Sequence, residues 1–405
     1  MRHSPHLRAP HLRARAEIDL AALRSNVRAL SARVAPGGAA LMAVVKADAY
    51  GHGMVESARA ARQAGARWLG TATPHEALAL RAAGIEGPLM CWLWTPGDPW
   101  LPCVEADIDV SVSDLWALAE VRDAARRAGR TARVQLKADT GLGRSGCQPA
   151  DWTELVATAL AGQAAGELTV TGLWSHLACA DEPGHPSIDA QLDRFHEMAE
   201  HAEKAGVEPE VRHIANSAAA LTLPRTHFDL VRVGIALYGI SPSPDIGRPE
   251  DFGLRPVMTL SASLAQVKGV PAGHGVGYGH THTTGHDTTL GLVPAGYADG
   301  IPRQASGHGP LLIEGETAWR RVAGRVAMDQ FTVDLGGATL APGSRALLFG
   351  PGDRGEPTAQ DWADAAGTIA YEIVTRIGPR VPRVFLNEST TPTDARGSWE
   401  AAWSR

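Results

Sequence analysis

Residues 39–53 read AALMAVVKADAYGHG and carry the most informative pattern in the chain. The apolar half is typical of a buried strand of a parallel sheet, and this strand stops at Lys46, before a Gly-His-Gly turn. A lysine in a tight apolar site has a lowered pKa, which frees its amine to attack an aldehyde. The alternative is a strand-terminal lysine that extends into solvent. Tyr50 and the two glycines, which permit close approach of a ligand, favour the functional interpretation.

Composition limits the class of protein. A length of 405 residues favours two domains, and 44% hydrophobic and 20% charged residues are ordinary for a soluble globular chain. A net charge of −6 argues against nucleic acid or an anionic membrane as the main partner. The four cysteines have no CxxC spacing and are expected to be free thiols in a reducing cytoplasm. The basic residues 1–15 lack an apolar segment, so we expect a disordered tail and no secretory signal.

Eight short β-like runs alternate with Ala-rich amphipathic stretches over residues 16–240. This alternation predicts a (β/α)8 barrel of the TIM type, with a parallel sheet closed on itself. The strands are expected at Ala40–Val45, Trp68–Thr71, Leu89–Trp94, Asp109–Ser113, Arg133–Lys137, Val170–Ser175, Val211–Ile214 and Leu230–Val233.

Polar residues follow the carboxyl ends of these runs, the face on which barrel enzymes build their sites. They are Lys46, Lys137, His176, Asn216, Ser217 and Arg232. Barrels often hold a phosphate in the last two loops, where Asn216-Ser217 and Gly234-Ile235 are found. Two structural alternatives remain open: a hydrogen-bonded core histidine for His176 and an ion-paired arginine for Arg232.

The amino-acid composition and the periodicity of the chain change after residue 240. Residues 241–256 are rich in proline and glycine and are expected to be a linker. Residues 257–390 have the β-branched residues and turn signals of a mainly antiparallel β domain. One helix near Ala359–Ala366 and a final strand at Arg383–Leu386 are expected there, followed by a frayed segment at 391–405.

Two motifs carry less weight. GLGRSG at 141–146 matches GxGxxG, but Gln148-Pro149 intervenes before a helix can begin, which disfavours a dinucleotide site. His274, His280, His282 and His286 lack an acidic or cysteine partner at zinc spacing, which favours a solvated loop and no metal.

Together with residues 44–53, seven further stretches resemble the alanine racemases, in the same order and over roughly residues 16–386. They are Lys137–Arg144, Ser175–Asp181, His213–Ser217, Arg232–Gly239, Gly296–Gly300, Gly324–Gln330 and Tyr371–Ile373. Val233 and Leu177 depart from the usual pattern, and Leu177 borders His176.

The resemblance implies a pyridoxal-phosphate enzyme that interconverts L- and D-alanine in the cytoplasm and supplies D-alanine for peptidoglycan. Lys46 would hold the cofactor and act as one catalytic base, and Tyr278 would be the other, acting on the partner subunit of a homodimer. Residues implied to bind the cofactor are Tyr50, His176, Asn216, Ser217, Arg232, Gly234, Ile235 and Tyr371.

The resemblance also assigns residues to the substrate. Arg144, Met328 and Asp329 would bind it, and the access corridor would be lined by Asp181, Tyr297, Arg303 and Arg325. Lys137 matches a lysine that carries a carbon dioxide adduct in some members. Three alternatives remain open: a racemase for another amino acid, a cofactor carrier without turnover and, less favoured, a decarboxylase.

Overall fold

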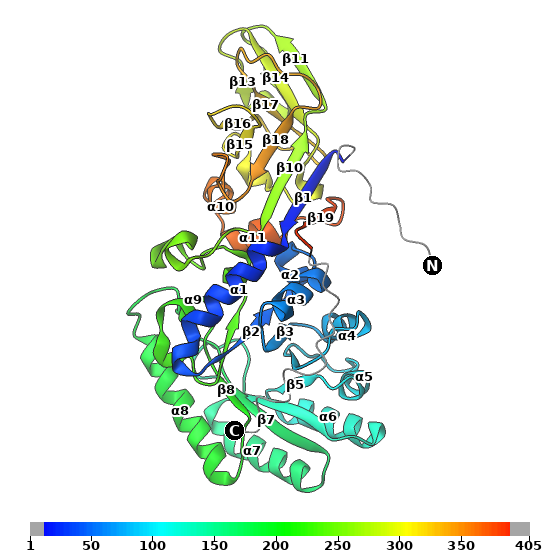
Figure 1. Ribbon diagram of the computed structural model, residues 1–405, viewed down its shortest axis with the longest axis vertical. Helices are drawn as coiled ribbons and strands as arrows, with labels where there is room; N and C mark the ends of the chain where they lie inside the picture. The colour runs from blue at the N-terminus through cyan, green and yellow to red at the C-terminus, as the bar shows by residue number, and fades with distance from the viewer. Residues whose placement is uncertain (1–11, 389–405) are drawn as a thin grey trace.

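The computed structural model describes residues 12–388, which form two parts arranged end to end along the long axis (Figure 1). One part is a barrel of parallel strands with helices around it, and the other is a mainly antiparallel sheet. The predicted fold class is confirmed.

The barrel strands fall on the eight predicted runs and pair, all in parallel, in the order β8-β7-β6-β5-β4-β3-β2-β9. Two backbone hydrogen bonds complete the ring between β8 and β9, from Asp229 N to Arg212 O and from Arg232 N to Ala215 O, both 3.1 Å long. The strand bounds are β2 Ala40–Val44, β3 Trp68–Thr71, β4 Leu89–Cys91, β5 Asp109–Val112, β6 Ala132–Lys137, β7 Leu168–Trp174, β8 Val211–His213 and β9 Leu230–Val233.

Helices between the strands bury their apolar faces on the barrel. In α1, for example, Leu23, Val27 and Leu30 are buried, and the Asp19 carboxylate caps the first turn. The bounds are α1 Leu20–Val34, α2 Lys46–Gly51, α3 Met54–Gln63, α4 Pro74–Ala82, α5 Trp100–Glu105, α6 Leu115–Ala128, α7 Pro149–Ala164, α8 Ser187–Ala205 and α9 Ser217–Thr222.

The second part is a nine-stranded sheet with the order β11-β14-β17-β16-β15-β18-β10-β1-β19, beside the small hairpin β12–β13. Its strands are β1 Ala14–Asp19, β10 Met258–Ser263, β11 Gln266–Val270, β12 Gly275–Val276, β13 His282–Thr283, β14 Thr288–Val293, β15 Pro310–Ile313, β16 Arg320–Ala323, β17 Phe331–Asp334, β18 Arg345–Phe349 and β19 Arg383–Leu386.

The expected boundary at residue 16 needs a correction, because β1 joins the second sheet. It pairs antiparallel with β10 and parallel with β19. Arg13, inside the expected tail, forms a 2.7 Å ion pair with the buried Asp299. The sequence of a six-residue strand does not indicate which sheet the strand joins, so only the tertiary structure could assign β1 to the second sheet. The rest of the expected tail (1–11) and the expected frayed segment (391–405) lie outside the described residues.

Near the junction of the two parts, the predicted helix and final strand are confirmed as α10 (Ala359–Ala366) and β19. The short helix α11 (Ala370–Thr375) was not predicted, although it carries Tyr371 and packs on α2. The expected linker contains two 3-10 turns, η5 (Pro244–Ile246) and η6 (Pro249–Phe252). No helix within residues 12–388 is both long and apolar enough to cross a membrane.

Candidate active site

Lys46 leaves the end of β2 on an unusual turn. The four residues Ala47 to Tyr50 all have left-handed backbone angles, with φ between 53° and 55°. For residues with a Cβ atom this conformation costs roughly 1–2 kcal/mol each. Strain of this kind persists only where the surrounding structure fixes the backbone.

Three other elements fix this turn. From α4, the Glu76 carboxylate accepts from Ala47 N at 2.6 Å. The Asp48 carboxylate accepts from Met54 N at the start of α3, at 2.8 Å. On β19, Arg383 donates from Nε to Gly51 O at 2.9 Å. The position from which the Lys46 side chain departs is therefore set by the whole barrel end and by the second sheet.

The Lys46 amine lies among aromatic rings and cations. Its Nζ is 5.9 Å from the ring centroid of Tyr50 and 5.8 Å from that of Trp92. Burial lowers the pKa of Lys46 most, the Arg144 charge lowers it further, and Glu76 opposes the change. More of the amine is therefore neutral and nucleophilic than in a solvent-exposed lysine.

Arg232 is buried at the carboxyl end of β9. Its Nη1 donates to Nδ1 of His213 at 2.9 Å, and its Nη2 donates to Ser175 O at 2.8 Å and to Nδ1 of His176 at 3.0 Å. Burial lowers the pKa of Arg232 to about 9, so the group stays charged at neutral pH. Within residues 12–388 no carboxylate forms an ion pair with Arg232, so the ion-pair alternative is wrong, and its Nε–H has no protein acceptor there.

These contacts determine the tautomers of the two histidines. A guanidinium only donates, so Nδ1 of both His176 and His213 must accept, which leaves the ring proton of each on Nε2. Burial, followed by the Arg232 charge, lowers the pKa of both rings well below the usual range. Both are therefore neutral at physiological pH.

Trp174, at the end of β7, provides a flat surface beneath these groups. Lys137 Nζ lies 4.3 Å and Arg232 Cζ 4.8 Å from its ring centroids, and the His213 ring stacks on it at 5.6 Å. The Lys137 amine also donates to Ser145 Oγ at 2.5 Å. Burial, together with Arg232 and Arg144, lowers the pKa of Lys137 to about 7.

The glycine-rich stretch at 141–146 forms a tight loop. The Asp139 carboxylate accepts from the backbone N–H groups of Gly141 and Gly143, and α7 begins only at Pro149. The glycines serve this turn and do not open a helix, which agrees with the interpretation against a dinucleotide site. The exposed Arg144 lies at the tip.

A narrow cradle lies where α9 and the segment after β9 meet. Ser217 Oγ accepts from Gly234 N at 2.9 Å, and Asn216 caps α9. A Cβ atom on Gly234 would lie 2.2 Å from Oη of Tyr50, so only glycine fits. Ile235 begins the 3-10 turn that follows.

Two phenols border this cradle. The ring centroids of Tyr50 and Tyr371 are 6.3 Å apart. Burial raises the pKa of both, so both stay protonated and can donate to an anion. The predicted cofactor-binding residues are thus brought together at the barrel mouth.

A separate set of predicted residues lies in the second part of the chain, in turns and loops outside its strands. Tyr278 is 73% exposed, and it lies between Gly277 and Gly279, whose φ angles are 66° and 70°. The Arg325 guanidinium lies beside Gly279, because a Cβ atom there would be 3.4 Å from Arg325 Cζ. Tyr278 and Arg325 therefore share one exposed surface.

The other predicted residues of this part of the chain are also exposed. Tyr297 N donates to Ala327 O at 3.0 Å, which places Tyr297 beside Met328, and the two side chains are 40% and 53% exposed. Asp329 forms a 2.7 Å ion pair with Arg380. Arg303 is exposed on this part of the chain, and Asp181 is exposed on the barrel.

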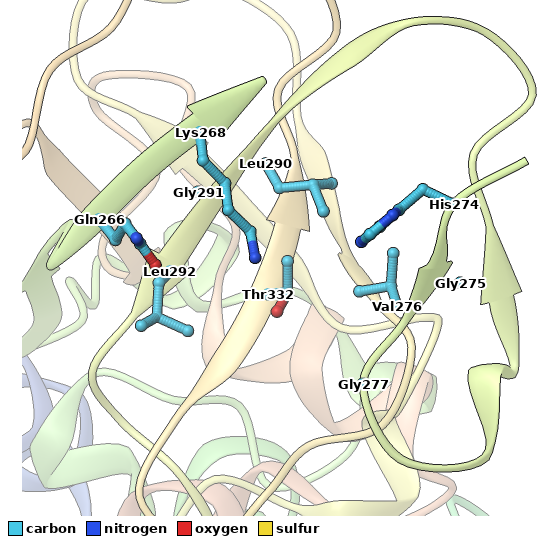
Figure 2. A pocket seen from close by; sticks show the side chains of 10 residues that line it. All are labelled: Gln266, Lys268, His274, Gly275, Val276, Gly277, Leu290, Gly291, Leu292 and Thr332. Carbon is cyan, nitrogen blue, oxygen red and sulfur yellow. The ribbon is translucent and has the colours of Figure 1, made fainter. Parts of the chain in front are cut away.

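A small hollow of about 100 Å³ adjoins the Tyr278 segment. Lys268 and His274 point into it from opposite sides, with Thr332 between them and Gly277 at its edge (Figure 2). Among the described residues no group of three or more His, Cys, Asp or Glu side chains is arranged to hold a metal ion.

Sequence reasoning did not assign several residues that the structure brings into the site. Trp174 and His213 could have been found, because they are the last residues of β7 and β8 and lie one residue before the ends of the expected runs. Trp92 and Gln135 were missed because both fell inside expected strands, Leu89–Trp94 and Arg133–Lys137. In the structure β4 ends at Cys91, and Trp92 directly follows it.

Comparison with known proteins identifies the family. The alanine racemase N-terminal domain matches residues 18–242, and the C-terminal domain matches residues 257–385. An alanine racemase of Streptomyces coelicolor is 72% identical over 382 residues, which cover 93% of this chain and 97% of the relative.

Solved structures agree with this match. The crystal structure of alanine racemase from Streptomyces lavendulae has a TM-score of 0.91 and 69% identity, and covers 93% of this chain and 97% of that one. The enzyme from Bacillus anthracis has a TM-score of 0.82 at 34% identity, with 94% of this chain and 96% of that one covered. The chain belongs to the alanine racemase family, isomerases that interconvert the two enantiomers of alanine.

Proposed function

We propose that this chain racemises alanine with pyridoxal 5′-phosphate bound through Lys46, and that each active site is completed by Tyr278 of a second copy in a homodimer. The observation that carries the proposal is the barrel mouth. It combines a lysine of lowered pKa, an arginine with a free Nε–H and a cradle that requires glycine.

The residues present fit this cofactor. Its phosphate would accept from the hydroxyls of Tyr50, Ser217 and Tyr371 and from the backbone N–H groups of Gly234 and Ile235, with Asn216 holding the start of α9. Its ring nitrogen would face Nε of Arg232, with His176 beside it. When bound, the cofactor supplies an electron sink that makes the Cα proton of alanine acidic.

The reaction requires a base on each face of the substrate. A proton leaves Cα on one side and another arrives on the opposite side, so two groups must flank that carbon. Lys46 supplies one of them from inside the barrel. Tyr278 is 73% exposed in the turn between β12 and β13, in the second part of the same chain, a position suited to reach the barrel mouth of a partner.

The exposed surface around Tyr278 would serve the substrate. A phenol acts as a base near neutral pH only in cationic surroundings, which Arg325 and Arg144 of the opposing barrel would provide. Arg144, Met328 and Asp329 would contact alanine, and Asp181, Tyr297, Arg303 and Arg325 would line its path. Through D-alanine the enzyme would serve peptidoglycan synthesis in the cytoplasm.

Lys137 would carry a carbon dioxide adduct. An amine with a pKa of about 7 is largely neutral under physiological conditions, and the neutral form reacts with carbon dioxide. The resulting anion would lie beside Arg144 and Arg232, the two cations that lower the pKa of the amine. To test this assignment, the adduct would be trapped chemically, and the tryptic peptide that contains Lys137 would be analysed by mass spectrometry.

The central test combines spectroscopy with site mapping. The purified chain should have a visible absorbance band, lose it on borohydride reduction and yield a pyridoxyl group on Lys46 by peptide mass spectrometry. A Lys46→Arg variant should show neither the band nor the modification. If the modification maps to Lys137 or to no lysine, the proposal is wrong. Rates with alanine, serine and lysine would then define the substrate range.

A further inference from the structure

A row of buried hydrogen bonds crosses the barrel interior from Arg232 to the opposite end. Nε2 of His213 lies 2.7 Å from Oε1 of Gln135. Nε2 of Gln135 donates to Oδ2 of Asp109 at 3.0 Å. His213 and Gln135 are fully buried and Asp109 is 1% exposed. No solvent exchange competes with these bonds, so each group depends on its neighbour.

The two ends of the row fix the direction of every bond. Arg232 can only donate and an ionised Asp109 can only accept. Gln135 must therefore direct its amide nitrogen to Asp109 and its oxygen to His213. A flipped amide would place oxygen against carboxylate and N–H against N–H. The neutral Nε2–H form of His213 is the only one that satisfies both neighbours.

The groups around Asp109 all donate hydrogen bonds to it, which favours its ionised, accepting form. Asp109 opens β5, at the end of the barrel opposite Lys46, where it accepts from Arg133 Nε at 2.8 Å and from Thr171 Oγ1 at 2.8 Å. Burial raises the pKa of Asp109, and the Arg133 charge and these hydrogen bonds oppose that change. Arg133 in turn pairs with Glu210 at 2.8 Å.

We propose that Asp109 and Gln135 are positioning residues for catalysis, because they hold His213 in its Nε2–H form and thereby hold Arg232 with Nε facing the barrel mouth. The inference rests on the proposed role of Arg232 toward the cofactor ring. Without Gln135, no acceptor holds the proton on Nε2 of His213, and the proton can move to Nδ1. A donor would then face the Nη1 donor of Arg232, and the guanidinium would shift.

The first experiment reads the tautomer directly in the unmodified protein. Full-length protein with its bound cofactor would be labelled with ¹⁵N-histidine, and the His213 signals assigned by their loss in His213→Phe. We expect the nitrogen shifts of a neutral ring protonated on Nε2. A ring protonated on Nδ1, or on both nitrogens, overturns the proposal. The result does not depend on whether Lys46 holds the cofactor, so the two proposals can fail separately.

The second experiment tests the consequence for catalysis. Gln135→Met keeps the side-chain volume and removes both hydrogen bonds, and should lower kcat by about 10-fold or more, the effect typical of lost supporting hydrogen bonds around a site. KM for alanine should change less than kcat, and the His213 signals should move.

Thr226→Val is the matched control, because Thr226 is buried and its hydroxyl donates to Leu223 O at 2.8 Å, outside the row. It should lower the unfolding midpoint without changing the tautomer or kcat. The proposal is overturned if Gln135→Met retains both kcat and the wild-type tautomer, or if Thr226→Val lowers kcat equally. If Gln135→Met does not fold, a wild-type ring protonated on Nδ1 still overturns the proposal.

Discussion

Gly234 shows how closely a single residue limits the barrel mouth. A Cβ atom added to Gly234 would lie 2.2 Å from the Tyr50 hydroxyl oxygen, so there is no room for a side chain. Gly234→Ala should weaken pyridoxal phosphate binding by at least about 10-fold, because the added methyl group displaces Tyr50 and loses roughly one good hydrogen bond. An absorbance titration of the cofactor would measure the dissociation constant.

Two further variants define the cause of that effect. Gly37→Ala is the matched control, since nothing lies within 4 Å of its added Cβ atom. Adding Tyr50→Phe to Gly234→Ala should weaken binding little further, because it deletes the hydroxyl that the added methyl group has already displaced. If Gly234→Ala binds as tightly as the wild type, the cradle is not the phosphate site.

In buffer free of carbon dioxide, where Lys137 carries no adduct, its amine gives the protein a defined pH dependence. The free amine titrates near 10.4 and the folded one at about 7, so between these values the unfolded chain binds more protons. The free energy of unfolding should therefore rise with pH over this window, by up to about 1.4 kcal/mol per unit. Lys137→Met should stabilise the protein most at pH 7, and the gain should shrink towards pH 10.

Urea unfolding of the wild type and Lys137→Met at pH 7 and pH 9.5 would measure this difference. A gain of the same size at both pH values would contradict the lowered pKa. A loss of stability at pH 7 would mean that the hydrogen bond to Ser145 and the contact with Trp174 outweigh the burial of the amine.

At the scale of elements, α2 combines strain with function. Ala47 is exposed and has a φ of 53°, so its Cβ atom adds strain without packing. Ala47→Gly should raise the free energy of unfolding by about 0.5–1 kcal/mol, because the relief of left-handed strain exceeds the added entropy of the unfolded glycine. Chemical denaturation would measure the change.

A matched substitution in a right-handed helix should have the opposite sign. Ala157 is exposed in the middle of α7, and Ala157→Gly should lower stability by about 1 kcal/mol. If both glycine variants destabilise equally, the turn after Lys46 is not strained.

At the scale of the whole molecule, the two sets of site residues lie on different parts of the chain. The proposed dimer predicts that two inactive variants complement each other. In a Lys46→Ala and Tyr278→Phe heterodimer, one site regains both bases and the other loses both. Co-expression of the two variants should therefore recover about a quarter of the wild-type activity if subunits mix at random.

Pairing either variant with the double variant Lys46→Ala/Tyr278→Phe provides the control. The double variant should not rescue Tyr278→Phe, since it contributes no second base, and should not rescue Lys46→Ala, since neither chain has the lysine. Failure of the two single variants to complement would place Tyr278 at the site of its own chain or outside catalysis.

The local patterns of the sequence determined the barrel and much of its mouth. Runs such as Ala40–Val44 and Leu230–Val233 are apolar because both faces of a parallel strand are buried, and this signal is contained within each run. Polar residues at their carboxyl ends then had to meet on one face. Lys46, Lys137 and Arg232 could be located for this reason.

Only the tertiary structure decided how these residues are held. Three features join residues that are far apart in the chain. They are the pairing of β1 with the second sheet, the left-handed turn after Lys46 and the row of hydrogen bonds from Arg232 to Asp109. Strand periodicity indicates which residues are buried, but not which partner satisfies a buried polar group. That choice depends on barrel closure, which brings β5, β6, β8 and β9 around one interior.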